Sequence, residues 1–235
     1  MKFVARCDLA KINTRKVGKD GERNRNGFGF RQPIMKTFKI HLIRHGATDA
    51  NTAGMYIGNR TDLPLSPEGV RELQQMREAI EYPDIERLYT SPMLRCKQSA
   101  NIIYPGFEPH VIDELTEYDF GEFEGKTAEQ LELMPQYAEW TAGRLEAPEG
   151  GETTQNFVKR QALALNMIVR DMMSHDVTNA GVIMHGGAIM MLLAACAVPR
   201  KHSVEWTSDN GRGYSIMITP SLYHSSGIVE VYDII

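Results

Sequence analysis

Two histidines follow short apolar runs that are typical of buried β-strands. The run 38–43 (FKIHLI) leads into the triplet RHG, which contains His45, and the run 181–184 (GVIM) leads into HGG, which begins at His185. In open α/β sheets, ligands bind beyond the carboxyl ends of the strands, so both imidazoles are expected at one edge of a sheet. The adjacent glycines let a ligand approach the backbone and expose amide N–H groups to it.

Two arginines add donors for an anion. Arg95 falls in the first turn of a helix that Ser91 and Pro92 are predicted to begin. A cation there is unfavourable unless an anion is shared between its guanidinium and the helix N-terminus. Arg44 supplies a second planar donor suited to phosphate. Two arginines and two histidines therefore predict a pocket for a phosphate dianion. No histidine pair has metal-ligand spacing, so we expect no metal and no cofactor.

Strand-like and helix-like segments alternate along residues 35–235, and they must position these side chains. Ser66 and Pro67 predict a helix start, and Thr127 predicts a capping box. The alternation predicts an α/β fold, three-layer α/β/α, with a mostly parallel central sheet and helices on both faces. Strands are expected at 38–43, 87–90, 110–112, 181–184, 213–219 and 228–235, and helices after 66, 91 and 127, over 153–174 and over 187–197.

Residues 1–34 differ from the rest in charge. They hold nine Lys or Arg and three Asp or Glu, which gives this segment a net charge of +6. Since the whole chain has a net charge of −4, the remaining residues have a net charge of −10. This segment has no sustained apolar period and is predicted to be a basic, disordered extension to a domain over 35–235. Our hypothesis is that Met35 is the natural start, with a transit peptide as the weaker alternative. An acidic body with a short basic tail is not typical of a nucleic-acid-binding protein.

The composition is typical of a soluble globular protein. No apolar run approaches the roughly 20 residues of a membrane span, and no secretory signal is evident. The three cysteines are scattered, which argues against disulfides or structural zinc and favours a cytoplasmic location. We expect a small phosphorylated metabolite as the partner, with no nucleic acid and no membrane, and a monomer or homodimer.

Six ordered segments resemble signatures of the histidine phosphatase superfamily, which includes cofactor-dependent phosphoglycerate mutases. RHG alone recurs by chance, whereas six segments in the family's order across 38–190 are specific. The resemblance implies a phosphoglycerate mutase-like fold. The segments are RHGATDAN (44–51), YIGNRTDLPLSPEG (56–69), SPMLRCKQSA (91–100), ELTEYDFGEFEGKT (114–127), GGET (150–153) and VIMHGGAIM (182–190).

The resemblance also implies a division of roles. His45 is the nucleophile that becomes phosphohistidine, and Glu117 protonates the leaving alkoxide and later deprotonates water. The family's acid lies four residues before the glycine of a Phe-Gly pair, which selects Glu117; Glu122 and Asp119 are the alternatives. The implied catalytic residues are His45, Glu117, His185, Arg44 and Arg95, and the implied substrate-binding residues are Arg44, Gly46, Thr48, Asn51, Ile57, Gly58, Arg95 and Gly186.

The acid loop separates the candidate functions. YDFGEFEG at 118–125 most resembles the branch of α-ribazole-phosphate phosphatases and broad-specificity phosphatases. Mutases of the family typically carry an E-R-x-Y-G loop and a long basic insertion, whereas the stretch 126–150 is short with few basic residues. The sequence therefore predicts a metal-independent phosphatase that hydrolyses a small phosphate monoester. The alternative is a phosphoglycerate mutase, and a third reading is a non-catalytic phosphate-binding protein.

Overall fold

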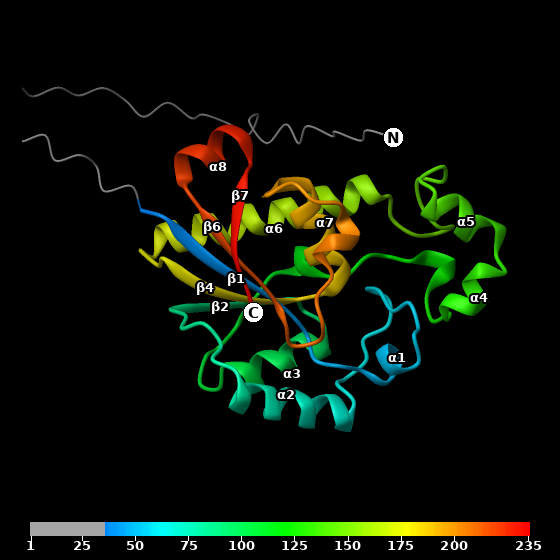
Figure 1. Ribbon diagram of the computed structural model, residues 1–235, viewed down its shortest axis with the longest axis horizontal. Helices are drawn as coiled ribbons and strands as arrows, with labels where there is room; N and C mark the ends of the chain where they lie inside the picture. Colours follow the sequence, from blue (N-terminus) through cyan, green and yellow to red (C-terminus); the bar gives the residue numbers. More distant parts are fainter. Residues whose placement is uncertain (1–35) are drawn as a thin grey trace, which may run out of the picture.

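The computed structural model describes residues 36–235, which form a seven-stranded sheet flanked by helices (Figure 1). Neighbouring strands pair in parallel, except that β6 is antiparallel to both β1 and β7. The predicted mostly parallel sheet is confirmed. The extension over 1–34 and the start at Met35 lie outside the described residues. The strand order is β3 (His110–Val111), β2 (Arg87–Thr90), β4 (Asn179–Met184), β1 (Phe38–Arg44), β6 (Gly213–Ile218), β7 (Val229–Ile234) and β5 (Ala197–Val198).

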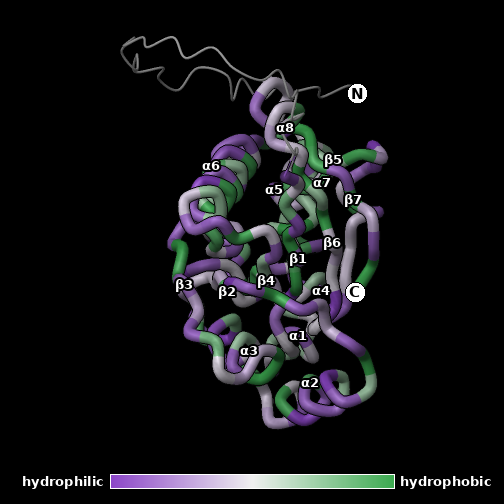
Figure 2. The backbone as a smooth tube through the Cα atoms, turned by 90° about the vertical axis from the view of Figure 1, so that its left-hand side faces the viewer, coloured by the Kyte–Doolittle hydropathy of each residue, from purple (hydrophilic) through white to green (hydrophobic). Residues whose placement is uncertain are grey.

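The apolar residues of β1 alternate between two cores. Leu42 packs in the core on the α6 and α7 side, whereas Ile43 packs in the core on the α2 and α3 side. Successive side chains of a strand point to opposite faces, so a strand covered on both faces is apolar throughout. Figure 2 shows the central strands lying between these helices. The predicted three layers are confirmed. The covering helices are α2 (Pro67–Ala79), α3 (Leu94–Ile103), α6 (Thr154–Ser174) and α7 (Gly186–Cys196).

Local capping signals place three helices as predicted. Ser66 Oγ accepts the Gly69 N–H at 2.9 Å, and Pro67 is the first residue of α2. Thr127 forms a capping box with Gln130 at the start of α4 (Ala128–Glu132). Thr153 Oγ1 accepts from the amide of Asn156 at 3.1 Å and begins α6. These side chains bond amides that lack partners inside the first helical turn.

The predicted start of α3 at Ser91 is wrong. The helix begins at Leu94, after Met93, which makes no side-chain cap. The Leu94 N–H donates instead to Asp62 Oδ1 at 2.7 Å, so the cap comes from a distant loop. The Ser91 hydroxyl lies 2.8 Å from His185 Nε2 and accepts at 3.4 Å from the N–H of Met93, the residue before the helix. Arg95 still falls in the first turn of α3, as predicted.

Short helices surround the end of the sheet at which β1 and β4 finish. Figure 1 shows α1, α4 and α5 grouped beyond that end, while α8 lies near the turn between β6 and β7. Among residues 36–235, no helix is both long enough and apolar enough to cross a membrane. The remaining helices are α1 (Asp49–Thr52), α5 (Pro135–Thr141) and α8 (Pro220–Ser226), with 3₁₀ turns at Asp113–Leu115, Gly121–Phe123 and Ser203–Trp206.

Candidate active site

His45 follows the last residue of β1 and is held by its own neighbours. Its side chain is buried, and Nδ1 lies 2.7 Å from the carbonyl oxygen of Gly46. A carbonyl can only accept, so Nδ1 carries the hydrogen and Nε2 keeps its lone pair. The backbone is fixed too, because the His45 carbonyl accepts from the Asn210 side-chain amide at 2.8 Å. The ring therefore holds an unprotonated Nε2 in a fixed orientation.

His185 packs against His45 from the end of β4. The two ring centroids are 5.2 Å apart and the planes meet at 68°. His185 is fully buried, with Nε2 bonded to Ser91 Oγ at 2.8 Å. The buried thiol of Cys96 lies 3.6 Å from the same nitrogen. Ser91 therefore fixes this ring by Nε2, while Nδ1 lies 3.8 Å from the same Cys96 sulfur.

Of the two predicted arginines, Arg95 is buried and Arg44 is partly buried. Arg95 is 2% exposed and donates from Nη2 to the Gly58 carbonyl at 3.0 Å and from Nη1 to the Thr61 carbonyl at 3.1 Å. Arg44 donates from Nη1 to the Ser208 carbonyl at 2.7 Å. Its buried Nε has no hydrogen-bond partner among residues 36–235. A guanidinium has five N–H donors, so both arginines keep donors for an anion, and an anion would satisfy Nε of Arg44.

Glu117 lies next to the segment of the second histidine. Its carboxyl group is 7% exposed and spans two backbone amides, with Oε1 accepting from Tyr118 at 2.8 Å and Oε2 accepting from Gly187 at 2.9 Å. The charges of Arg95 and Arg44 also act on this carboxyl group. The structure thus brings together all five residues predicted to be catalytic.

Burial sets the protonation of these groups. Desolvation, then the positive charge of Arg95, lowers the pKa of His45 to about 3, although the hydrogen bond to the Gly46 carbonyl opposes the shift. The same two causes lower the pKa of His185 well below its usual value. Burial raises the pKa of Glu117, although two amide hydrogen bonds and the arginines oppose this. Both imidazoles are therefore neutral at pH 7, and Glu117 retains a proton more readily than an exposed carboxyl group does.

Arg160 and Gln161 hold the acid loop in place, and sequence reasoning did not single them out. Arg160 Nη1 donates to the carbonyls of Glu114 at 2.7 Å and Thr116 at 2.8 Å, and Nη2 donates to the Glu117 carbonyl at 3.2 Å. The fully buried Gln161 donates to the first two of these carbonyls. Both residues lie on α6. The sequence predicted the helix but gave no local signal that these two side chains reach the acid loop.

The prediction that glycine amides in the site are exposed to a ligand is wrong for the glycines described here. The Gly46 N–H donates to Ser99 Oγ at 2.9 Å, and the Gly187 N–H is taken by Glu117. The Gly58 N–H donates to both carboxylate oxygens of Glu124, at 3.0 and 3.1 Å. These amides hold protein side chains rather than standing open to a ligand. The hydrogen-bond donors left for an anion at this site are therefore mainly on side chains rather than on the backbone.

The other residues predicted to bind the substrate differ in what they contact. Thr48 and Asn51 cap α1 reciprocally, with Asn51 Oδ1 accepting from the Thr48 N–H at 3.0 Å, so they shape the loop after His45. Gly186 lies against Arg44, since an added Cβ would be 3.1 Å from Arg44 Nε. Ile57 is partly buried beside Gly58.

The alternative acids are placed differently from Glu117. Asp119 accepts from Arg60 Nε at 2.6 Å and from the Gly121 N–H at 3.0 Å, so it stabilises the loop. Within residues 36–235, no hydrogen bond joins Glu122 to any of the five residues predicted to be catalytic. Glu117 is thus the carboxyl group that the structure brings beside the histidines and arginines.

The buried neutral histidine predicts loss of stability in acid. An unfolded histidine binds a proton near pH 6.5, whereas folded His45 does so only near pH 3, so stability falls as pH drops through this window. From pH 7 to pH 4, this group alone is expected to lower the free energy of unfolding by about 3 kcal/mol. Urea unfolding of wild type and His45→Ala at both pH values measures it. An equal fall in the two proteins would contradict the assignment.

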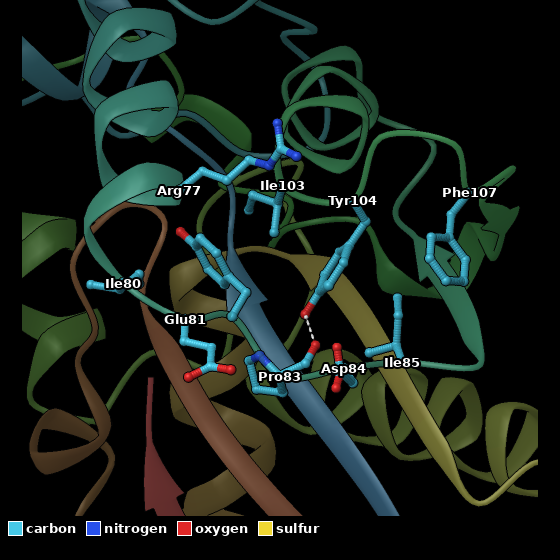
Figure 3. Close-up of a pocket in the computed structure, with 10 residues that line it drawn as sticks. Arg77, Ile80, Glu81, Pro83, Asp84, Ile85, Ile103, Tyr104 and Phe107 are labelled. Atoms are coloured by element: carbon cyan, nitrogen blue, oxygen red, sulfur yellow. Dashed lines mark hydrogen bonds between the residues drawn. The ribbon is translucent and has the colours of Figure 1, made fainter.

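A groove of about 560 Å³ lies elsewhere on the molecule. Figure 3 shows it between the end of α2, the segment before β2 and the end of α3, with the Tyr104 hydroxyl donating to the Pro83 carbonyl at 3.1 Å. None of the predicted site residues lines this groove. Across the described residues, no group of three or more His, Cys, Asp or Glu side chains is arranged to hold a metal ion.

The sheet order and the two histidines at its edge define a phosphoglycerate mutase-like α/β enzyme fold. The chain belongs to the histidine phosphatase superfamily (branch 1), whose family model matches residues 40–223. The adenosylcobalamin/alpha-ribazole phosphatase of Salmonella typhimurium is 29% identical over 161 residues, which cover 66% of this chain and 78% of the relative. The predicted family and the prediction of a phosphatase enzyme are confirmed.

Solved structures agree with the fold. The alpha-ribazole phosphatase from Shigella flexneri superposes with a TM-score of 0.68 at 23% identity, covering 83% of this chain and 95% of that chain. The phosphoglycerate mutase from Thermus thermophilus gives a TM-score of 0.61 at 25% identity, covering 84% and 98%. The three-layer architecture predicted from strand and helix alternation is therefore that of known proteins in this superfamily.

Proposed function

We propose that the protein is a metal-independent phosphatase that hydrolyses a small phosphate monoester through a phosphohistidine at His45. The observation that carries this proposal is the hydrogen bond from Nδ1 to the Gly46 carbonyl, which leaves a neutral Nε2 free to attack. The buried Arg95 and the partly buried Arg44, whose charges both act on His45, compensate the charge of a phosphate dianion. Phosphoryl transfer requires mainly positioning and charge stabilisation, which this arrangement supplies.

In the first step, the arginines and His185 bind the phosphoryl oxygens. With the Ser91 hydroxyl donating to Nε2 of His185, Nδ1 carries a hydrogen and can donate to a phosphoryl oxygen. His45 Nε2 forms a bond to phosphorus while the ester P–O bond breaks. Protonated Glu117 donates its proton to the departing alkoxide oxygen, so a neutral alcohol leaves.

In the second step, Glu117 acts as a base. Its carboxylate takes a proton from water as the water oxygen attacks phosphorus, and the N–P bond to His45 breaks. Inorganic phosphate leaves, His45 returns to the neutral state and Glu117 regains its proton. The covalent intermediate divides one difficult displacement into two easier ones.

The substrate class that we propose is a small phosphorylated metabolite. The relative from Salmonella typhimurium is named as a phosphatase of adenosylcobalamin and alpha-ribazole compounds. A mutase remains the second candidate, because the Thermus thermophilus structure has that activity in its name. We propose further that residues 35–235 act as one histidine phosphatase domain in the reducing cytoplasm.

A paired assay tests hydrolysis against mutase activity. The protein is incubated with phosphorylated sugars, nucleosides and hydroxy acids in the presence of a chelator, and released phosphate is measured. In parallel, interconversion of 2- and 3-phosphoglycerate is followed by nuclear magnetic resonance. We expect phosphate release that the chelator leaves unchanged and no interconversion. Interconversion faster than release would favour the mutase, and absence of both would favour a phosphate-binding protein.

A further inference from the structure

Glu124 holds the amide of Gly58, a residue that the family resemblance places among the substrate-binding residues. The Gly58 N–H donates to Glu124 Oε1 at 3.0 Å and Oε2 at 3.1 Å. The carbonyl of the same glycine accepts from Arg95 Nη2 at 3.0 Å. Gly58 therefore binds the carboxylate of Glu124 through its N–H and the guanidinium of Arg95 through its carbonyl oxygen. The negative charge of Glu124 is fixed close to the phosphate pocket.

This carboxylate lies on the side of the acid loop. A Cβ added to Gly58 would lie 1.9 Å from the Tyr118 carbonyl oxygen, 2.9 Å from the Phe120 ring and 2.9 Å from Glu124 Oε2. Tyr118 directly follows Glu117, which protonates the leaving alkoxide in the proposed mechanism. In that mechanism the leaving group departs toward the acid loop, which brings Phe120 and Glu124 against Gly58.

The basic side chains around the acid loop are already bound. Arg60 pairs with Asp119, with Nε to Oδ1 at 2.6 Å. Arg160 pairs with Glu152 at 2.6 Å and donates to loop carbonyls. The charge of Arg60 also acts on Glu124, but Arg60 is shared between two carboxylates, those of Asp119 and Glu124. A substrate carboxylate arriving here would therefore still meet a net negative charge. Like charges brought together near a protein surface repel unless a cation compensates them.

We propose that Glu124 is a specificity-determining residue that rejects phosphate esters whose leaving group carries a carboxylate near the phosphate. The substrates of the site are then phosphate monoesters of neutral alcohols. This inference rests on the proposed phosphatase function and specifies its substrate class. It also gives a physical reason for a poor fit to phosphoglycerates, which carry such a carboxylate.

Two esters isolate the effect of the substrate carboxylate. Glycerol 3-phosphate has a hydroxymethyl group at the position where 3-phosphoglycerate has a carboxylate, and the two are otherwise the same. Hydrolysis of each is measured as kcat/KM. Wild type is expected to prefer glycerol 3-phosphate. In Glu124→Gln, which keeps an acceptor oxygen for the Gly58 N–H, the ratio of kcat/KM for 3-phosphoglycerate to that for glycerol 3-phosphate is expected to rise roughly tenfold. Glu129→Gln removes one exposed charge on α4 and is expected to leave this ratio unchanged.

Salt provides a measurement that needs no variant. Because salt screens charges near the surface, raising ionic strength is expected to increase the same ratio in wild type. A ratio unaltered by both Glu124→Gln and salt would overturn the inference while hydrolysis of glycerol 3-phosphate continues. An equal rise in Glu129→Gln would also overturn it, since the effect would then be one of net charge. If wild type hydrolyses no ester at all, the proposed function itself fails.

Discussion

His45→Ala is expected to lose essentially all turnover, with kcat falling roughly 10⁴- to 10⁶-fold, the range seen when a nucleophile is removed. Nε2 of His45 is the atom that accepts the phosphoryl group in the proposed mechanism. The hydrogen bond from Nδ1 to the Gly46 carbonyl orients that atom, whereas the second ring, that of His185, is held by its Nε2 instead. Steady-state phosphate release from an alkyl phosphate measures the loss.

The same variant is expected to lose the phosphoenzyme. Wild type mixed briefly with a ³²P-labelled ester and denatured in alkali should carry label that acid releases, as a phosphoramidate does. His224→Ala is a matched control, because His224 is exposed on α8. Label and turnover should persist there. Circular dichroism establishes that each variant is folded. Label retained on His45→Ala would show that another residue is the nucleophile.

Glu117→Gln is expected to lower kcat by roughly 10²- to 10⁴-fold on alkyl phosphates, the usual contribution of a general acid–base group. Glutamine has a similar shape but cannot donate a proton to the alkoxide. A p-nitrophenyl ester needs little protonation of its leaving group, so its first step should be affected far less. Rapid-quench measurement of phosphoenzyme formation with both esters separates the two cases.

The alternative acids supply the controls for this variant. Glu122→Gln is expected to stay within a few-fold of wild type. Asp119→Asn is expected to act mainly on stability, because Asp119 holds Arg60 and the Gly121 amide. Near-normal turnover of Glu117→Gln on an alkyl ester, together with a large loss in either of these, would move the acid to that residue.

The pH dependence of phosphoenzyme formation is expected to follow from the titration of Glu117. Burial raises the pKa of Glu117, and the first step needs its protonated form, so phosphoenzyme formation should slow as pH rises through that pKa. Glu117→Gln should lack this basic limb. On the acid side, the pKa of His45 is about 3, so protonation of this ring should not limit the rate near pH 5.

Local signals in the sequence predicted most of the fold. Apolar runs located β1, β2 and β4, and Ser66 and Thr127 located two helix starts. These signals work because a strand's pattern and a helix cap depend on residues within a few positions of each other. The paired histidines followed from the same logic, since two parallel strands end at one edge of the sheet.

Contacts between distant segments could not be predicted in this way. Ser66 and Ser91 both precede proline, yet only Ser66 caps a helix, since α3 begins only at Leu94 and the Ser91 hydroxyl bonds His185. Arg160 contacts backbone that lies 43 to 46 positions earlier, and its partners are carbonyl groups, which every residue has. Side-chain identity therefore gives no sign of the pairing. Glu124 on the Gly58 amide is a third case, 66 positions apart.

The place of β1 in the centre of the sheet has a consequence for the newly made chain. β1 is flanked by β4 and β6, and the His45 carbonyl accepts from Asn210, which lies 165 positions later. During synthesis, His45 therefore leaves the ribosome long before its neighbours exist. Until then β1 has two open hydrogen-bonding edges, which invite pairing with other chains. The surroundings of His45 are therefore complete only after β4 and β6 have paired with β1.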